Sequence, residues 1–255
     1  MRRLSYLAVC VAASARPASP PPSPAAPAAP AAPASVAAAA ADDTVQIVIA
    51  GTTDVHGWLR GWDYSGNVPD SSRGLTRVAT IMDSVRAANP ARVVLVDAGD
   101  DLQGTAITSG ALRDSLLPNP IIQAMNALRY DAAVIGNHEF NYGLSYLNRA
   151  VAQATFPMLA ANVYRPNGSR PYMASAVVQR GGARIALIGA TTPGSMIWDR
   201  DKLAGRVEVR DILPTVRASV SDARAQGADV VVVVLHSGLG GPSSYGPLAT
   251  PVASE

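Results

Sequence analysis

The sequence contains 255 residues, of which 48% are hydrophobic and 16% are charged. A chain of this length and composition can bury a substantial apolar core, so we expect one large globular domain. The formal net charge of +2 gives no sign of the strongly basic surface that nucleic-acid or membrane-surface binders carry, so we expect no nucleic-acid polymer as partner.

The first 15 residues are typical of an export signal. Two arginines precede the apolar residues 4–13, a segment that is too short to span a bilayer but suits a signal-peptide core. Cys10 is the only cysteine, so an internal disulfide is impossible. Its surroundings resemble a bacterial lipoprotein box, except that Val9 stands where a small residue is expected. We predict an exported protein of the periplasm or cell envelope, and lipid attachment at Cys10 and removal of the leader remain alternatives.

Residues 16–43 consist almost entirely of Pro, Ala and Ser. The prolines recur every few residues and prevent a helix despite the alanine content. We therefore predict a disordered, extended linker, followed by a folded domain over residues 44–255.

Four short apolar runs alternate with helical segments in this domain. The runs cover residues 45–50, 92–97, 132–135 and 230–235, and each ends in glycine or polar residues, as buried strands do. Apolar periodicity predicts helices over residues 75–88, 121–128 and 212–226. Residues 58–73 are predicted to be a loop, and residues 165–182 a loop with a strand edge. The alternation predicts an α/β fold.

Side chains that can bind a metal follow each predicted strand. Asp54 and His56 follow the first strand, Asp100 the second, Asn137 and His138 the third, and His236 the fourth. Ligands of α/β proteins bind outside the carboxyl ends of the strands, so we expect these side chains to meet at one edge. All three histidines of the chain occupy such positions, each within two residues of a glycine. This pattern favours a shared divalent-metal site over separate structural histidines.

The motifs resemble, in order and spacing, those of the calcineurin-like metallophosphoesterases. They are Thr-Asp-Val-His-Gly at residues 53–57, Gly-Asp at 99–100, Gly-Asn-His-Glu at 136–139 and Val-Leu-His at 234–236. Residues 97–105 and 136–143 are similar to the bacterial secreted 5′-nucleotidases. More narrowly, the chain resembles the 2′,3′-cyclic-nucleotide 2′-phosphodiesterase/3′-nucleotidase group, to which residues 161–163, 198–199 and 236–239 are also similar. The resemblance covers about residues 45–239. It implies a four-layer α/β/β/α sandwich of two mixed sheets flanked by helices.

The resemblance also implies a centre of two divalent ions, with manganese, cobalt, zinc and magnesium all open as identities. Carried over by position, Asp54 and His56 hold one metal, Asp100 bridges, Asn137 and His236 hold the other, and His138 faces the substrate phosphate. The implied reaction is hydrolysis of a nucleotide or cyclic-nucleotide phosphate ester by a metal-bound hydroxide. His138 would stabilise the charge on the phosphoryl oxygens or give a proton to the leaving group. We interpret Asp101 and Glu139 as groups that structure the loops.

Two features depart from the family pattern. Asn141 stands where the 5′-nucleotidases commonly have Asp, although Asn resembles the cyclic-phosphodiesterase group. No histidine follows His236, whereas the family supplies a downstream Gly-His-x-His segment and a base-binding domain. We therefore expect a truncated domain with an incomplete ligand set and weak metal binding. The alternatives are a catalytically incomplete fragment, an exported binding module that retains the fold, and a hydrolase of a sulfur ester or sugar phosphate.

Overall fold

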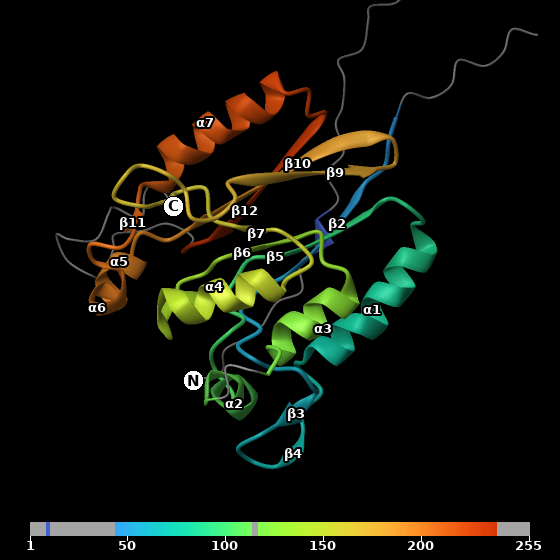
Figure 1. The fold of residues 1–255 in the computed structure, drawn as a ribbon. Coiled ribbons are helices and arrows are strands. Elements are labelled where there is room, and N and C mark those ends of the chain that lie inside the picture. The colour runs from blue at the N-terminus through green and yellow to red at the C-terminus, as the bar shows by residue number, and fades with distance from the viewer. Residues whose placement is uncertain (1–8, 11–43, 114–116, 239–255) are drawn as a thin grey trace, which may run out of the picture.

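The computed structural model describes residues 9–10, 44–113 and 117–238. Apart from Val9–Cys10, the predicted signal segment and the linker over residues 16–43 lie outside the described residues. Two sheets stack face to face, with α1, α3 and α4 on one side of the pair and α7 on the other (Figure 1). This is the predicted α/β/β/α arrangement. None of the helices in the described ranges combines the length and the apolar character that crossing a bilayer requires.

The first sheet has the order β1-β2-β5-β6-β7. Its strands are β1 (Val9–Cys10), β2 (Val48–Thr52), β5 (Val93–Asp97), β6 (Ala132–Val134) and β7 (Met158–Leu159). β2, β5, β6 and β7 run parallel, whereas β1 pairs antiparallel with β2, with Cys10 opposite Ile49. The sheet is therefore mixed. In the register Thr52 pairs with Asp97, so β2 and β5 end together at one edge.

The second sheet has the order β12-β10-β9 and is also mixed. β10 (Ala183–Thr191) runs parallel to β12 (Val230–His236) and antiparallel to β9 (Ser175–Arg180). Six residues of the segment predicted as a loop with a strand edge thus form a full strand. The prediction underrated it because Pro, Gly and Tyr dominate the sequence before it, and because β9 is only half-buried.

The main helices are α1 (Leu75–Ala88), α3 (Pro120–Leu128), α4 (Gly143–Gln153) and α7 (Ile212–Ala225). α1 has the predicted bounds, and α3 and α7 differ from prediction by one residue. Asn119 caps α3 by accepting hydrogen bonds from the backbone N–H groups of Ile121 and Ile122, and Pro120 occupies the first helical position. α4 lies outside the predicted helices.

Smaller elements complete the described chain. They are the hairpin of β3 (Trp62–Asp63) and β4 (Val68–Pro69), the pair of β8 (Val163–Tyr164) and β11 (Glu208–Val209), the helices α2 (Ala106–Arg113), α5 (Ser195–Trp198) and α6 (Arg200–Leu203), and the 3-10 turn η1 (His138–Phe140). The β3–β4 hairpin lies within the segment that we predicted to be a loop.

Strand alternation divides the interior into apolar layers. In β5, Val93 and Leu95 belong to the core shared with α1, α3 and α4, whereas Val94 and Val96 face the second sheet. This is the period of two that a strand buried on both faces requires.

β10 repeats the division on the other side of the interface between the sheets. Ile185 and Leu187 face the first sheet, and Ala186 and Ile188 pack with Ala223 of α7. Three layers of apolar side chains therefore lie between the four layers of helices and sheets. The carboxyl ends of β5 and β12 come to the same edge of the sandwich.

Candidate metal centre

All six predicted site residues meet at this edge. Asp54 and His56 lie in the loop after β2, Asp100 follows β5, Asn137 and His138 follow β6, and His236 is the last residue of β12. The first sheet contributes five of the side chains and the second contributes His236, so the complete set forms only when the two sheets stack.

Asp100 is the centre of the group and is only 3% exposed. Its Oδ2 atom lies 3.2 Å from Nε2 of His236, 3.9 Å from Nε2 of His138 and 4.0 Å from Nε2 of His56. Two sets of potential ligands share it: His56, Asp100 and His138, and Asp54, Asp100 and His236, with ligand atoms within 4.8 Å of one another in each set. Asp100 is therefore the one carboxylate that belongs to both sets among the described residues.

The loops that carry these residues adopt left-handed backbone conformations. Asp54, His56 and Asp100 have φ values of 53°, 48° and 67°. Such conformations cost free energy for non-glycine residues and cluster at functional sites. Side chains two residues apart on an extended segment point to the same side, but Asp54 and His56 are not extended. They converge because the loop turns and pairs with the next one, His56 donating its backbone N–H to the Asp100 carbonyl at 2.8 Å.

Two glycines let the loops after β5 and β6 approach each other. Gly99 has a φ of 97°, and a Cβ atom there would lie 2.6 Å from the backbone nitrogen of Gly136. A Cβ on Gly136 would lie 2.7 Å from the backbone nitrogen of Asp100. Any larger residue at either position would push Asp100 away from Asn137.

Glu139 joins the same two loops through hydrogen bonds to their backbones. It is fully buried, and its carboxylate accepts four backbone N–H groups. Oε2 accepts from Asp100 at 2.8 Å and Gly136 at 2.7 Å, and Oε1 accepts from Asp101 at 2.6 Å and Leu102 at 3.0 Å. Both oxygens are occupied, so Glu139 structures the loops, as we interpreted it, and has no free oxygen for a ligand.

A pair of buried carboxyls, Asp97 and Asp101, lies behind the centre. Asp97 accepts hydrogen bonds from Thr52 Oγ1 and the Gly99 N–H, both at 2.5 Å, whereas neither carboxyl oxygen of Asp101 has a donor among the described residues. Burial raises the pKa of both groups, and for Asp101 the neighbouring Asp97 charge raises it further. We therefore interpret Asp101 as a neutral acid.

The tautomers of two imidazoles fit a metal site. Nδ1 of His56 lies 3.0 Å from the Gln103 carbonyl, and Nδ1 of His236 lies 2.8 Å from the Ala98 carbonyl. A carbonyl oxygen only accepts, so each Nδ1 carries the hydrogen and Nε2 faces Asp100. Metal-binding histidines are commonly oriented in this way.

The two oxygen atoms near Nε2 of His236 also indicate a position suited to a cation. Its Nε2 lies 2.9 Å from Asn137 Oδ1 and 3.2 Å from Asp100 Oδ2. An imidazole lone pair cannot face two acceptors unless a proton or a metal ion lies between them. Nitrogen, carboxylate and amide-oxygen donors together suit a divalent transition metal or magnesium.

The pKa values of the ion-free chain reflect the same crowding. Burial opposes the charged imidazole of His236, but the hydrogen bond and charge of Asp100 outweigh it and raise its pKa to about 9. The hydrogen bond between Asp54 and His56 lowers the pKa of Asp54 to about 2 and raises the pKa of His56.

His138 differs from the other two imidazoles. Its Nδ1 lies 2.6 Å from the side-chain oxygen of Asn141, and its side chain is 33% exposed. Asn141 in turn donates its Nδ2–H to Asp199, which binds Lys202. The strand-end pattern does not predict Asp199 and Lys202, because they belong to the short helices after β10. The sequence signal for Asp199 was the Trp-Asp pair at residues 198–199, and Lys202, the only lysine of the chain, stands three residues after Asp199.

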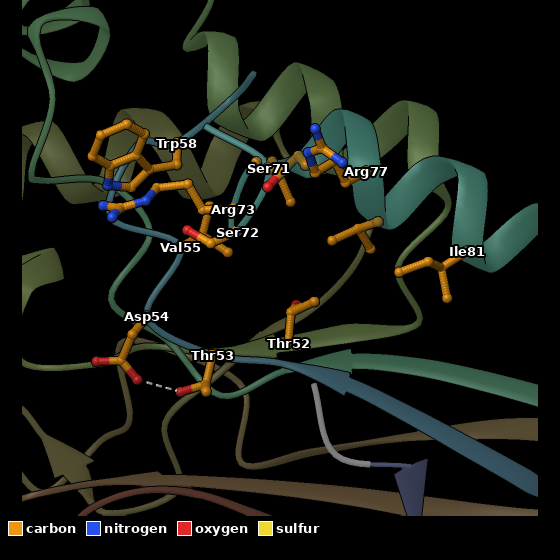
Figure 2. Close-up of a pocket in the computed structure, with 13 residues that line it drawn as sticks. Thr52, Thr53, Asp54, Val55, Trp58, Ser71, Ser72, Arg73, Arg77 and Ile81 are labelled. Atoms are coloured by element: carbon orange, nitrogen blue, oxygen red, sulfur yellow. Dashed lines mark hydrogen bonds between the residues drawn. The ribbon is translucent and has the colours of Figure 1, made fainter. Parts of the chain in front are cut away.

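A pocket of about 180 Å³ lies beside the centre, between the end of β2 and α1 (Figure 2). Asp54 lies at one end of it and Ile81 at the other. Arg73 stacks on Trp58 at 4.2 Å and pairs with Asp70. The pocket therefore touches the centre only through Asp54.

No protein-family profile matches the sequence. The 2′,3′-cyclic-nucleotide 2′-phosphodiesterase/3′-nucleotidase of Haemophilus influenzae is 37% identical over 207 residues, which cover 76% of this chain and 31% of that protein. The trifunctional nucleotide phosphoesterase protein YfkN of Bacillus subtilis is 34% identical over 216 residues, which cover 78% of this chain and 15% of that protein. The chain thus spans less than a third of the length of these two relatives.

The solved structure of the calcineurin-like phosphoesterase YfkN from Bacillus subtilis superposes with a TM-score of 0.72 at 34% identity, over 76% of this chain and 63% of that chain. Fold, sequence and strand-end residues agree. The chain belongs to the calcineurin-like phosphoesterases. That fold implies divalent metal ions, and the Asp and His groups described above can bind them.

Proposed function

We propose that the chain carries the metal-dependent centre of a hydrolase that cleaves nucleotide phosphate esters, of the 2′,3′-cyclic-nucleotide phosphodiesterase and 3′- or 5′-nucleotidase type. The observation that carries the proposal is the convergence of three imidazoles on the Asp100 carboxylate, each within 4.0 Å. The names of the relatives supply the substrate class.

In this proposal Asp54 and His56 would hold one cation, Asn137 and His236 would hold a second, and Asp100 would contribute to both. Two bound cations would supply Lewis acidity, making water a nucleophile at neutral pH and neutralising charge on the phosphate. The chain holds the donors in place beforehand: carbonyls orient His56 and His236, and Glu139 fixes the loop that carries Asp100.

His138 acts on the substrate itself. Asn141 engages its Nδ1, so its Nε2 is left for the phosphate or the leaving group. A protonated Nε2 would donate a hydrogen bond to a phosphoryl oxygen and pass its proton to the departing alkoxide. The remaining exposure of the ring, 33%, gives a substrate access to it.

Hydrolysis of 2′,3′-cyclic AMP, 3′-AMP and 5′-AMP by the purified, chelator-treated chain tests the proposal, with manganese, cobalt, zinc or magnesium restored one at a time. We expect turnover with at least one metal, and loss of both turnover and metal in Asp100→Asn. Glu208→Asn is the control, because it changes an exposed carboxylate that pairs with Arg210 and is not among the site residues. No turnover of any nucleotide with any of the four metals would contradict the proposal.

The convergence of the six predicted site residues and the enzyme names of the relatives favour a hydrolase over an incomplete fragment or an exported binding module. A binding module would keep its nucleotide affinity in Asp100→Asn. Sugar phosphates and sulfur esters in the same assay test the remaining alternative substrates. Export to the periplasm or cell envelope is also part of the proposal, and it rests on the N-terminal sequence alone; fractionation of cells that express the chain tests it.

A further inference from the structure

We infer that Asp199 is a positioning residue for His138, acting through the side-chain amide of Asn141. The inference rests on the proposed function, because it explains how the imidazole that faces the substrate is held. A line of hydrogen bonds carries it. Nδ1 of His138 lies 2.6 Å from Oδ1 of Asn141, Nδ2 of Asn141 donates to Oδ2 of Asp199 at 2.9 Å, and Nζ of Lys202 donates to Oδ1 of Asp199 at 2.7 Å.

Asp199 is built into the structure as a fixed acceptor. It is only 2% exposed, so its carboxylate depends on protein partners in place of water. Each carboxylate oxygen has one such partner: Lys202 on Oδ1 and Asn141 on Oδ2. Lys202 stands one turn further along α6, a spacing that places its ammonium beside Asp199.

The roles of donor and acceptor then determine which atom carries the hydrogen in each of these hydrogen bonds. A carboxylate can only accept, so Asn141 must turn its NH₂ group toward Asp199 and its oxygen toward His138. That oxygen also only accepts, so Nδ1 of His138 must carry a hydrogen. Nε2 of His138, 3.9 Å from Asp100, is therefore the nitrogen that takes up the proton to be donated to the substrate.

An Asp199→Asn variant reverses this order. Lys202 has only hydrogens to offer, so it takes the amide oxygen of the new side chain. The new NH₂ group then faces Asn141, which must turn its own oxygen toward residue 199 and its NH₂ group toward His138. Nδ1 becomes the acceptor, and the hydrogen of the neutral ring moves to Nε2. The imidazolium that acts as proton donor carries a hydrogen on both ring nitrogens, so a ring whose Nδ1 accepts from Asn141 is a poorer proton donor, although no atom is added or removed around the metal centre.

The double variant Asn141→Asp/Asp199→Asn restores the original order. The carboxylate at 141 accepts from Nδ1 of His138 and from the NH₂ group at 199, while the oxygen at 199 still accepts from Lys202. Asn141→Asp alone places two carboxylates in contact. The exchange therefore separates positioning of His138 from a plain requirement for Asp199 in folding α6.

Long-range ¹H–¹⁵N NMR of the imidazoles tests the inference without depending on activity. The chain has three histidines, so the spectrum is simple, and His138→Gln assigns the signal of interest. The matched control is Asp201→Asn, since Asp201 lies 3.5 Å from the same ammonium and its side chain is 76% exposed. We expect the Nδ1–H form of His138 in the unaltered chain, in Asp201→Asn and in the double variant, and the Nε2–H form in Asp199→Asn.

Nucleotide hydrolysis by the metal-loaded proteins gives the second measurement. We expect kcat to fall roughly 10- to 100-fold in Asp199→Asn, the range for partners that orient functional side chains, with KM little changed and recovery in the double variant. An Nδ1–H signal in Asp199→Asn, or an Nε2–H signal in a folded double variant, would overturn the inference. If Asp199→Asn does not fold, the double variant decides. If the unaltered chain hydrolyses nothing, the proposed function fails, while the NMR result still judges the positioning of His138.

Discussion

The carboxylate of Asp100 lies 3.2 Å from Nε2 of His236, joining the end of β5 in one sheet to the end of β12 in the other. The contact makes the candidate centre a property of the stacked sandwich. The first sheet supplies the other five site residues, and only the second sheet supplies His236. Changes that disturb the approach of the loops should therefore affect metal binding more than they affect the fold.

Gly99→Ala tests the close approach of the loops after β5 and β6. The new methyl group would lie 2.6 Å from the Gly136 nitrogen, and the alanine would have to adopt a φ of 97°. We expect the variant to fold with lower stability, by about 2 kcal/mol or more, and to bind manganese at least tenfold more weakly. Gly168→Ala is the matched control: its φ is 79°, but no atom lies within 4 Å of the added methyl group. Equal metal affinity in the two variants would contradict this account.

The strand-end pattern of the sequence predicted where the six site residues meet, because short apolar runs that end in Gly and polar groups are reliable signs of parallel strands. Their detailed positions could not be predicted. Asp54 and His56 converge through left-handed turns, and Asp199 reaches the site only because α6 packs beside α4. Such tertiary contacts leave no periodic trace in the sequence. β10, the central strand of the second sheet, followed Gly-rich residues and also escaped prediction.

Glu139→Gln tests the carboxylate that accepts four backbone N–H groups. The amide would turn its own NH₂ group against two of these donors, leaving them unsatisfied in a fully buried position. We expect a loss of unfolding free energy of about 2–4 kcal/mol in urea denaturation, and weaker metal binding in the folded state. Glu208→Gln serves as control, because Glu208 is exposed and pairs only with Arg210 among the described residues. A stability equal to that of the control would show that the four hydrogen bonds do not hold the loops.

The stability of the metal-free chain should fall as the pH rises. Burial raises the pKa of Asp101 and of Asp97, so the folded state holds protons that the unfolded state releases above about pH 4. The raised pKa of His236, about 9, acts in the same direction, since its stabilisation is complete below about pH 6.5 and is lost as the pH rises through 9. Asp54 acts oppositely and only in acid, because its pKa is lowered to about 2.

Thermal unfolding in the presence of a chelator measures this dependence. We expect a Tm several degrees lower at pH 9 than at pH 6, and a smaller decrease in Asp101→Asn, whose side chain cannot ionise. A Tm that rises over this interval would contradict the neutral state assigned to Asp101.

His138→Gln should separate binding of metal from turnover. The ring faces the open side of the centre, and a glutamine leaves Asp54, His56 and His236 in place. We expect kcat for 2′,3′-cyclic AMP to fall roughly 10²- to 10⁴-fold, the usual contribution of a general acid, with metal stoichiometry unchanged. Loss of a metal ion in this variant would instead identify His138 as a ligand.

The central claim is that the described chain forms a centre for two cations around Asp100. Isothermal titration of the chelator-treated chain with manganese tests it most directly, with His236→Ala titrated in parallel. The account predicts two ions per chain, and at most one in the variant, because His236 and Asn137 would hold the second ion. No binding at millimolar manganese, or an unchanged stoichiometry in His236→Ala, would contradict it.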